Sequence, residues 1–190
     1  MRAFGHRYEW PVVPDAAYVP GLFTLEECQA IINRWYESRV TEDKIPVNGR
    51  LYRDTDIRWI QATDPDAGWI ADRIDSAVAR WNEQVGFDME TCADFQLGYY
   101  AGGQHYEWHL DLGSKGNSRR KVSVVVMLTP RDQFEGGLLQ ILRAGGRIET
   151  CDLQVGGAVL FPAWMKHRVT PVISGGRWTL VAWYSGPPFR

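Results

Sequence analysis

The chain has 190 residues and a formal net charge of −2 at pH 7. A chain of this length can bury the core of one domain, and we expect residues 1–190 to form one. A net charge this close to zero gives no reason to expect nucleic acid or a membrane surface as a partner, and no apolar run is long enough to cross a bilayer.

The three cysteines, Cys28, Cys92 and Cys151, fit neither a disulfide framework nor a zinc motif. We therefore expect them to be small buried hydrophobic residues in a reducing compartment. Residues Met1–Asp15 contain no apolar core of a signal peptide. These features predict a cytoplasmic protein, and nothing in them indicates its oligomeric state.

The first part of the chain, residues 1–93, is predicted to be a helical support and a lid region. Residues 1–20 have the character of an extended arm with one strand. Thr24-Leu25-Glu26-Glu27 matches a capping box, in which the threonine and glutamate side chains each satisfy a backbone N–H. Apolar residues then follow at helical spacing, which predicts a helix over 24–38.

A second helix is predicted to begin at Asp64, as the cap, and Pro65, as the first helical residue. Gly86 is expected to end it. Between the helices we expect a loop or loose hairpin over Val40–Thr55 with its turn at Asn48-Gly49, then a short strand over Ile57–Gln61.

From Asp94 onward the segments become short, β-branched and separated by glycine or proline, which predicts strands. The eight candidates are 95–100, 106–112, 122–128, 138–142, 148–153, 158–161, 167–172 and 178–184. This count indicates a mainly β fold over 94–190, a jelly-roll or cupin-like double-stranded β-helix with the two helices packed on one sheet. Gly102-Gly103, Glu135-Gly136-Gly137 and Gly156-Gly157 are interpreted as turns, since none precedes a helix as a phosphate-binding loop would.

The sequence His109-Leu110-Asp111 is the first candidate for chemistry. Residues two apart on a strand face the same way, so the strand offers an imidazole and a carboxylate to one point. With His167 from far downstream, the set matches the two histidines and one carboxylate of non-haem Fe(II) oxygenases. A solitary His-x-Asp also arises by chance, so the prediction depends on the combination. His105 is too far from His109 on a strand to share the metal and is assigned to a loop or rim.

Arg177 follows His167 by ten residues and is expected on one strand face with Thr179, Val181 and Trp183. Three open metal positions would suit a chelating 2-keto acid and dioxygen, and the second carboxylate of the keto acid needs a cation. Arg177 can donate two N–H bonds to that carboxylate, Thr179 can add a hydroxyl, and Trp183 can exclude water. An ordinary rim arginine is the alternative interpretation.

The motifs occur in a recognisable order along the chain: Tyr100-x-x-Gly103-x-x-Tyr106-x-x-His109-x-Asp111, Glu135-Gly136-Gly137-x-Leu139, Gly157 to Phe161-Pro162, and His167-Arg168-Val169-Thr170-Pro171-Val172 to Arg177. In this order the chain resembles the Fe(II)/2-oxoglutarate dioxygenases of the prolyl 4-hydroxylase superfamily. The stretches 120–137 and 167–183 are most similar to its bacterial PKHD-type members. The resemblance covers most of residues 95–184.

The resemblance implies Fe(II), 2-oxoglutarate and O2 as cofactor and co-substrates, with ascorbate as an optional addition. It implies hydroxylation of an acceptor with release of succinate and CO2. The implied roles are iron ligands for His109, Asp111 and His167; the distal-carboxylate partner for Arg177; co-substrate contacts for Tyr100, Ser123, Thr179 and Trp183; and an acceptor contact for Tyr106.

The acceptor itself is left open between a prolyl or other peptidyl side chain, a free amino acid and a related small molecule. Val126 and Met127 stand where many relatives have tyrosine, and Leu138 replaces an acidic residue, which affects the acceptor pocket rather than the iron site. The segment Val40–Thr55 is expected to close over the site, with Arg50 and Arg53 as substrate contacts, or else to be a solvated loop.

Three alternatives stay open at this point. A nucleobase-demethylating oxygenase of the same fold is disfavoured because the chain lacks a second arginine six residues beyond Arg177 and has no broad basic face. A cupin-like module that binds without catalysis and a metal hydrolase are the other two.

Overall fold

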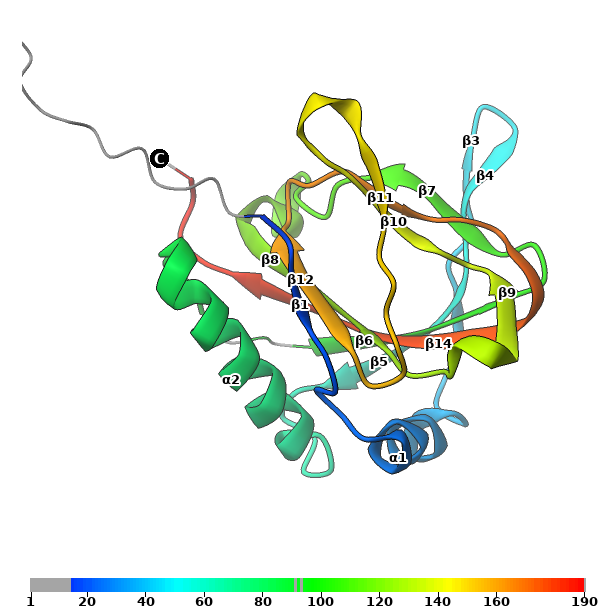
Figure 1. Ribbon diagram of the computed structural model, residues 1–190, viewed down its shortest axis with the longest axis horizontal. Helices are drawn as coiled ribbons and strands as arrows, with labels where there is room; N and C mark the ends of the chain where they lie inside the picture. The colour runs from blue at the N-terminus through cyan, green and yellow to red at the C-terminus, as the bar shows by residue number, and fades with distance from the viewer. Residues whose placement is uncertain (1–14, 91, 93, 190) are drawn as a thin grey trace, which may run out of the picture.

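The computed structural model describes residues 15–90, 92 and 94–189. Two antiparallel sheets face each other and enclose a barrel-like interior (Figure 1). The expectations for residues 1–14 lie outside the described residues.

In the described part of the chain, the first sheet has the strand order β1-β12-β8-β14-β6-β5-β2, with β9 paired to β14. Its strands are β1 (Ala17–Val19), β2 (Thr41–Glu42), β5 (Asp56–Gln61), β6 (Asp94–Ala101), β8 (Arg120–Met127), β9 (Phe134–Gly136), β12 (Ala158–Pro162) and β14 (Val172–Ser185). The second sheet has the order β11-β10-β13-β7-β4-β3. Its strands are β3 (Ile45–Val47), β4 (Arg50–Asp54), β7 (His105–His109), β10 (Leu139–Leu142), β11 (Ile148–Thr150) and β13 (His167–Val169). The predicted double-stranded β-helix architecture is confirmed.

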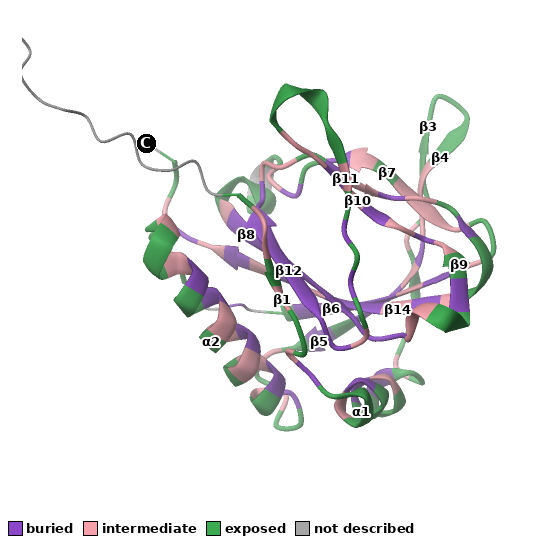
Figure 2. Ribbon diagram, viewed as in Figure 1, coloured by how far each residue is buried: buried purple, intermediate pink, exposed green. Residues whose placement is uncertain are grey.

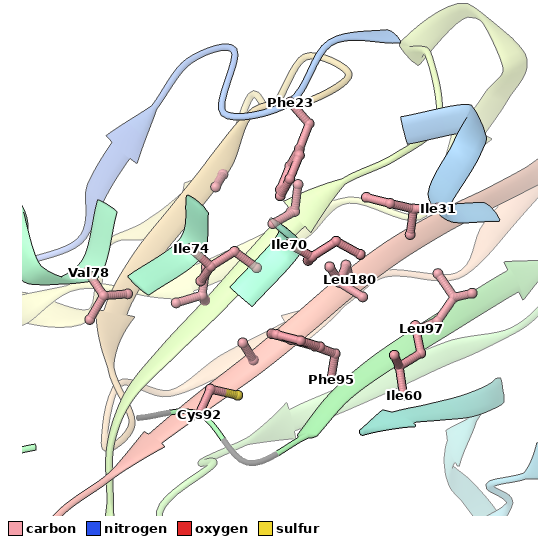
Figure 3. Close-up of a cluster of buried hydrophobic side chains, with 14 of the residues drawn as sticks. Phe23, Ile31, Ile60, Ile70, Ile74, Val78, Cys92, Phe95, Leu97 and Leu180 are labelled. Atoms are coloured by element: carbon pink, nitrogen blue, oxygen red, sulfur yellow. The ribbon is translucent and has the colours of Figure 1, made fainter. Parts of the chain in front are cut away.

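The helices α1 (Leu25–Trp35) and α2 (Gly68–Val85) lie on the outer face of the first sheet (Figure 1). Their apolar sides bury one large core against β5, β6, β8, β12 and β14. Figure 3 shows the side chains of this core, among them Phe23, Ile74, Phe95 and Leu180. The predicted placement of two helices on one sheet is therefore confirmed, as is the burial of Cys28, Cys92 and Cys151 as free thiols. No described helix has both the length and the apolar composition that crossing a membrane requires.

The start of α2 was predicted three to four residues too early. The Asp64 carboxylate accepts the N–H of Asp66, and the Asp64 carbonyl accepts the N–H of Ala67. Because these bonds form a turn, the helix begins only at Gly68. Its end is as predicted, with Gly86 in the left-handed conformation at φ 73°. The capping box of α1 is present, but α1 ends at Trp35 and not at residue 38.

The segment 40–55 forms the predicted hairpin, with Asn48 and Gly49 at φ 50° and 77° in its turn. Its strands β3 and β4 extend the second sheet, and Figure 2 shows that the tip is exposed. β2 and β5 also extend the first sheet, so the part before residue 94 adds strands to both walls of the barrel as well as helices.

β14 is much longer than predicted, since it starts at Val172. Gly175 (φ 70°) lies so close to Gln133 that a Cβ would be 2.1 Å from the Gln133 carbonyl oxygen. The sequence predicted one strand ending at residue 172 and another starting at 178, whereas Gly175 allows one continuous strand to pass β9.

Candidate functional site

His109, Asp111 and His167 converge at one end of the barrel interior. His109 ends β7 and pairs directly with His167, the first residue of β13. Asp111 lies just past β7, where its own N–H and that of Leu112 both donate to the Ala163 carbonyl at 3.0 and 2.9 Å. The carboxylate oxygens lie 3.8 Å from His109 Nε2 and 3.5 Å from His167 Nε2, and all three residues are buried.

The hydrogen bonds of the two histidines determine which ring nitrogen is available. Nδ1 of His109 lies 2.7 Å from the Glu107 carbonyl, and Nδ1 of His167 lies 2.9 Å from the Met165 carbonyl. Because a carbonyl only accepts, each Nδ1 carries a proton, so in the neutral ring the lone pair is on Nε2, the nitrogen nearer Asp111. Metal-binding histidines commonly have this arrangement.

The donor set fits the ferrous ion that the sequence predicts. Candidate donor atoms of the three residues all lie within 4.8 Å of one another. Two imidazoles and one carboxylate are the facial ligand set that leaves coordination positions open. Ser123 donates its hydroxyl to Asp111 Oδ2 at 2.5 Å and so orients the carboxylate.

Burial and neighbouring groups favour the protonation states of His109 and Asp111 that suit a metal ligand. Burial, and next to it the neighbouring His167, lower the pKa of His109 to about 3. The imidazole is therefore neutral at physiological pH. Burial opposes the charge on Asp111, but the two histidines and the Ser123 hydroxyl outweigh it and lower the pKa of its carboxyl below the ordinary value.

The three residues open into a cavity of about 420 Å³ between the two sheets. The cavity lining includes most of the predicted site residues: His109, Asp111, His167, Arg177, Tyr100, Thr179, Trp183, Tyr106 and Arg53. Arg177, Thr179 and Trp183 share one face of β14 as predicted.

Arg177 is 1% exposed, and no described carboxylate pairs with it. It donates from Nη1 to the Gly137 carbonyl, and its Nε has no hydrogen-bond partner. Its guanidinium carbon lies 5.5 Å from the ring centroid of Tyr100. Burial lowers the pKa of Arg177 to about 10, so it stays charged at neutral pH. The cavity thus contains a buried cation for which no described residue supplies a counter-ion.

Two of the predicted site residues do not line the cavity. Ser123, predicted to contact the co-substrate, instead holds Asp111. Arg50, predicted to contact the substrate, lies in a groove on the outer side of the hairpin with Tyr52 and His105. His105, assigned to a loop or rim, is instead the first residue of β7 and does not line the cavity. Its ring nitrogens lie near the carbonyls of Gly103 and Leu51.

Arg120 lines the cavity, a position that was not predicted. A register shift of β14 against β8 between Tyr184 and Ser185 leaves Lys121 as an extra residue, a β-bulge. Because of this bulge, the Arg120 side chain points towards the cavity. Its guanidinium carbon lies 4.0 Å from the ring centroid of Trp183. Simple alternation from Ser123 would have pointed Arg120 away from the cavity.

Gln96 and Trp59 also line the cavity and were not predicted to do so. They pair across β5 and β6, and the Trp59 ring lies 6.1 Å from that of Trp183. A signal for Gln96 existed, since it is the polar residue between Phe95 and Leu97, and a polar residue in a buried strand usually has a specific partner.

The fold and the triad together define a double-stranded β-helix protein with a candidate metal site in its barrel. Residues 95–185 match the 2OG-Fe(II) oxygenase superfamily. The chain is 40% identical over 81 residues to a PKHD-type hydroxylase of Synechococcus sp. (strain CC9605), covering 43% of this chain and 36% of that protein. It is 36% identical over 90 residues to a PKHD-type hydroxylase of Paraburkholderia phymatum, covering 44% and 39%. These alignments span less than half the length of either relative.

Solved structures show the same fold at low sequence identity. A prolyl-4-hydroxylase of Pseudomonas putida aligns with a TM-score of 0.74 at 20% identity, over 91% of this chain and 93% of that one. A prolyl hydroxylase of Trichoplax adhaerens, in complex with a hypoxia inducible factor peptide fragment, aligns with a TM-score of 0.73 at 19% identity, over 90% and 84%. The resemblance to Fe(II)/2-oxoglutarate dioxygenases of the prolyl 4-hydroxylase superfamily is confirmed.

Proposed function

We propose that the chain is a 2-oxoglutarate-dependent Fe(II) dioxygenase that hydroxylates its acceptor and releases succinate and CO2. Arg177 is the observation that carries this proposal. A fully buried guanidinium without a carboxylate partner is costly, and it shares a cavity with a His-Asp-His triad that fits iron. A dicarboxylate that reaches from the metal to Arg177 satisfies both features at once.

His109, Asp111 and His167 would hold the ferrous ion. When bound together, the ion, 2-oxoglutarate and O2 supply the oxidising chemistry. The chain's own residues bind and orient the co-substrate. Arg177 offers two N–H groups to the distal carboxylate, with Tyr100 and Thr179 beside it on the paired strands β6 and β14. Apolar cavity residues keep water from this part of the cavity: Val125, Leu139, Val169 and Val181.

For the acceptor we propose a prolyl or other peptidyl side chain, or a free amino acid or related small molecule. Arg120 supports an acceptor with a carbonyl or carboxylate, because it makes no described ion pair and its guanidinium lies over Trp183 at the cavity wall. Trp59 is 49% exposed and lines the same cavity, so it can cover an apolar ring or chain. Tyr106 completes this side of the cavity. Location in the cytoplasm stays a prediction.

The test is iron-dependent succinate formation from 2-oxoglutarate under air, with and without a panel of prolyl peptides and amino acids. We expect turnover by the parent, and loss of at least a hundredfold in His109→Ala. His105→Ala is the matched control, since this histidine lies on the same strand but outside the cavity. No iron-dependent succinate with any acceptor, even uncoupled, would contradict the proposal.

A further inference from the structure

Three side chains form a stack that ends on a metal-binding histidine. The rings of Tyr106 and His109 are nearly parallel, with centroids 3.4 Å apart and an interplanar angle of 12°. The guanidinium carbon of Arg53 lies 4.5 Å from the Tyr106 centroid. Because the imidazole already covers one face of the phenol ring, the guanidinium takes the other.

The stack depends on the backbone of the second sheet. β13 pairs His167 with His109 but Val169 with Tyr106, so β7 has one extra residue in this interval. The bulge lets Tyr106 and His109 face the cavity together although they are three residues apart. On the other side, Arg53 of β4 is directly opposite Tyr106 in the strand register.

Both terminal nitrogens of Arg53 are already engaged by the protein. Nη1 pairs with the Asp43 carboxylate at the base of the hairpin. Nη2 donates to Gln96 Oε1 at 3.0 Å, on β6 of the first sheet. The Arg53 side chain is only 12% exposed. These contacts hold the guanidinium in one plane, and of its three nitrogens only Nε is left without a hydrogen-bond partner.

We infer that Arg53 is a positioning residue that fixes the plane of the His109 imidazole through the Tyr106 ring, rather than a contact for the acceptor. The inference rests on the proposed function, since it assumes a metal at the triad. An imidazole binds a metal along the Nε2 lone pair in the ring plane, so a tilt of His109 misdirects that lone pair. The bond from Nδ1 to the Glu107 carbonyl constrains the ring at one edge, and the stack constrains its face.

Metal affinity without turnover tests this inference. Cobalt(II) is titrated into the metal-free 190-residue chain, and the visible d–d absorption of the cobalt is recorded with no 2-oxoglutarate present. We expect Arg53→Gln and Tyr106→Leu each to weaken cobalt binding by about ten- to a hundredfold, the usual effect of losing a group that orients a metal ligand. The cobalt spectrum should change in both variants. Tyr106→Phe keeps the ring and should bind like the parent.

Arg50→Gln is the matched control, because Arg50 is on the same hairpin but faces the outer groove; it should keep the parent's cobalt affinity. If Arg53 acts through Tyr106, the double variant should bind no more weakly than Tyr106→Leu alone. Parent-like affinity and spectrum in Arg53→Gln, or additive effects in the double variant, would overturn the inference and leave the proposed function standing. Failure of the parent to bind cobalt would overturn both.

Discussion

Arg177 is the residue on which co-substrate binding should depend most. We expect Arg177→Gln to raise KM for 2-oxoglutarate by about ten- to a hundredfold, because hydrogen bonds to a charged group contribute roughly 1.5–3 kcal/mol. Ligand-free Arg177→Gln should unfold at the same urea concentration as the parent or a higher one, since it removes a buried charge without a counter-ion. Arg168→Gln is the control. The Arg168 guanidinium is held by Gln140 over the Trp108 ring, and Arg168 does not line the cavity. A parallel loss of stability and affinity would instead assign Arg177 a structural role.

At this scale the sequence predicted the residues whose positions follow from strand alternation or from a motif. Alternation along β14 predicted Arg177, whereas the motif predicted His109, Asp111 and His167; Asp111 lies past the end of β7, so strand alternation does not place it. The structure brings all four into one cavity. Arg120 could not be predicted in the same way, because a bulge decides its facing and the sequence around Lys121 carries no mark of a bulge.

At the scale of elements, the turn that leaves β9 is shaped around Arg177. Gly137 has φ 56°, and a Cβ there would lie 2.9 Å from Arg177 Cδ and from Val172 Cγ2. Gly137→Ala should therefore displace the guanidinium and raise KM for 2-oxoglutarate several-fold. Gly145→Ala is the control, since φ is 75° and no atom lies within 4 Å of the added Cβ. Both variants should lose about 1–2 kcal/mol for the left-handed backbone, so equal KM values for the two would contradict the prediction.

A second element-scale contact joins edge strands of the two sheets. Glu149 of β11 accepts the Tyr18 hydroxyl of β1 at 2.7 Å and a two-pronged bond from Arg143. Arg143 first, and then Tyr18, lower the pKa of Glu149 from 4.5 to about 2. A carboxyl whose pKa is lowered by folding stabilises the folded state at pH values above its ordinary pKa. This contribution is lost as the pH falls towards 2.

Glu149→Gln should therefore be less stable than the parent at pH 7, by about 1 kcal/mol for a partly exposed pair. The difference should shrink steadily between pH 5 and pH 3. Urea unfolding of both proteins at pH 7, 5, 4 and 3 measures it, and a difference that does not change with pH would show that the ion pair contributes nothing.

Among the elements, the long periodic segments were predictable and the pairings were not. α1 and eight of the nine described strands from Asp94 onward follow from spacing and turn residues that lie close together in sequence. β9 is only three residues long and pairs with a distant part of β14. The strands β3 and β4 have short, mixed sequences, and β4 pairs with β7 across some fifty residues of chain. Such pairings are decided by tertiary packing, which a single sequence does not display.

For the molecule as a whole, the site is built from parts that meet only in the folded chain. His109 and His167 come from β7 and β13, and Asp111 is held by a backbone carbonyl next to Pro162 of β12. A metal that binds this arrangement must bind the folded state in preference to the unfolded chain.

At a free metal concentration of roughly one hundred times Kd, binding adds about 2.7 kcal/mol to the free energy of unfolding. For a chain of this size we expect Tm to rise by roughly 5–10 °C. Thermal scans with cobalt(II), and again after excess chelator, measure this rise and its reversal. His109→Ala should show almost none of it, whereas His105→Ala should show all of it. A rise of equal size in both variants would mean that the stabilising metal binds elsewhere on the protein.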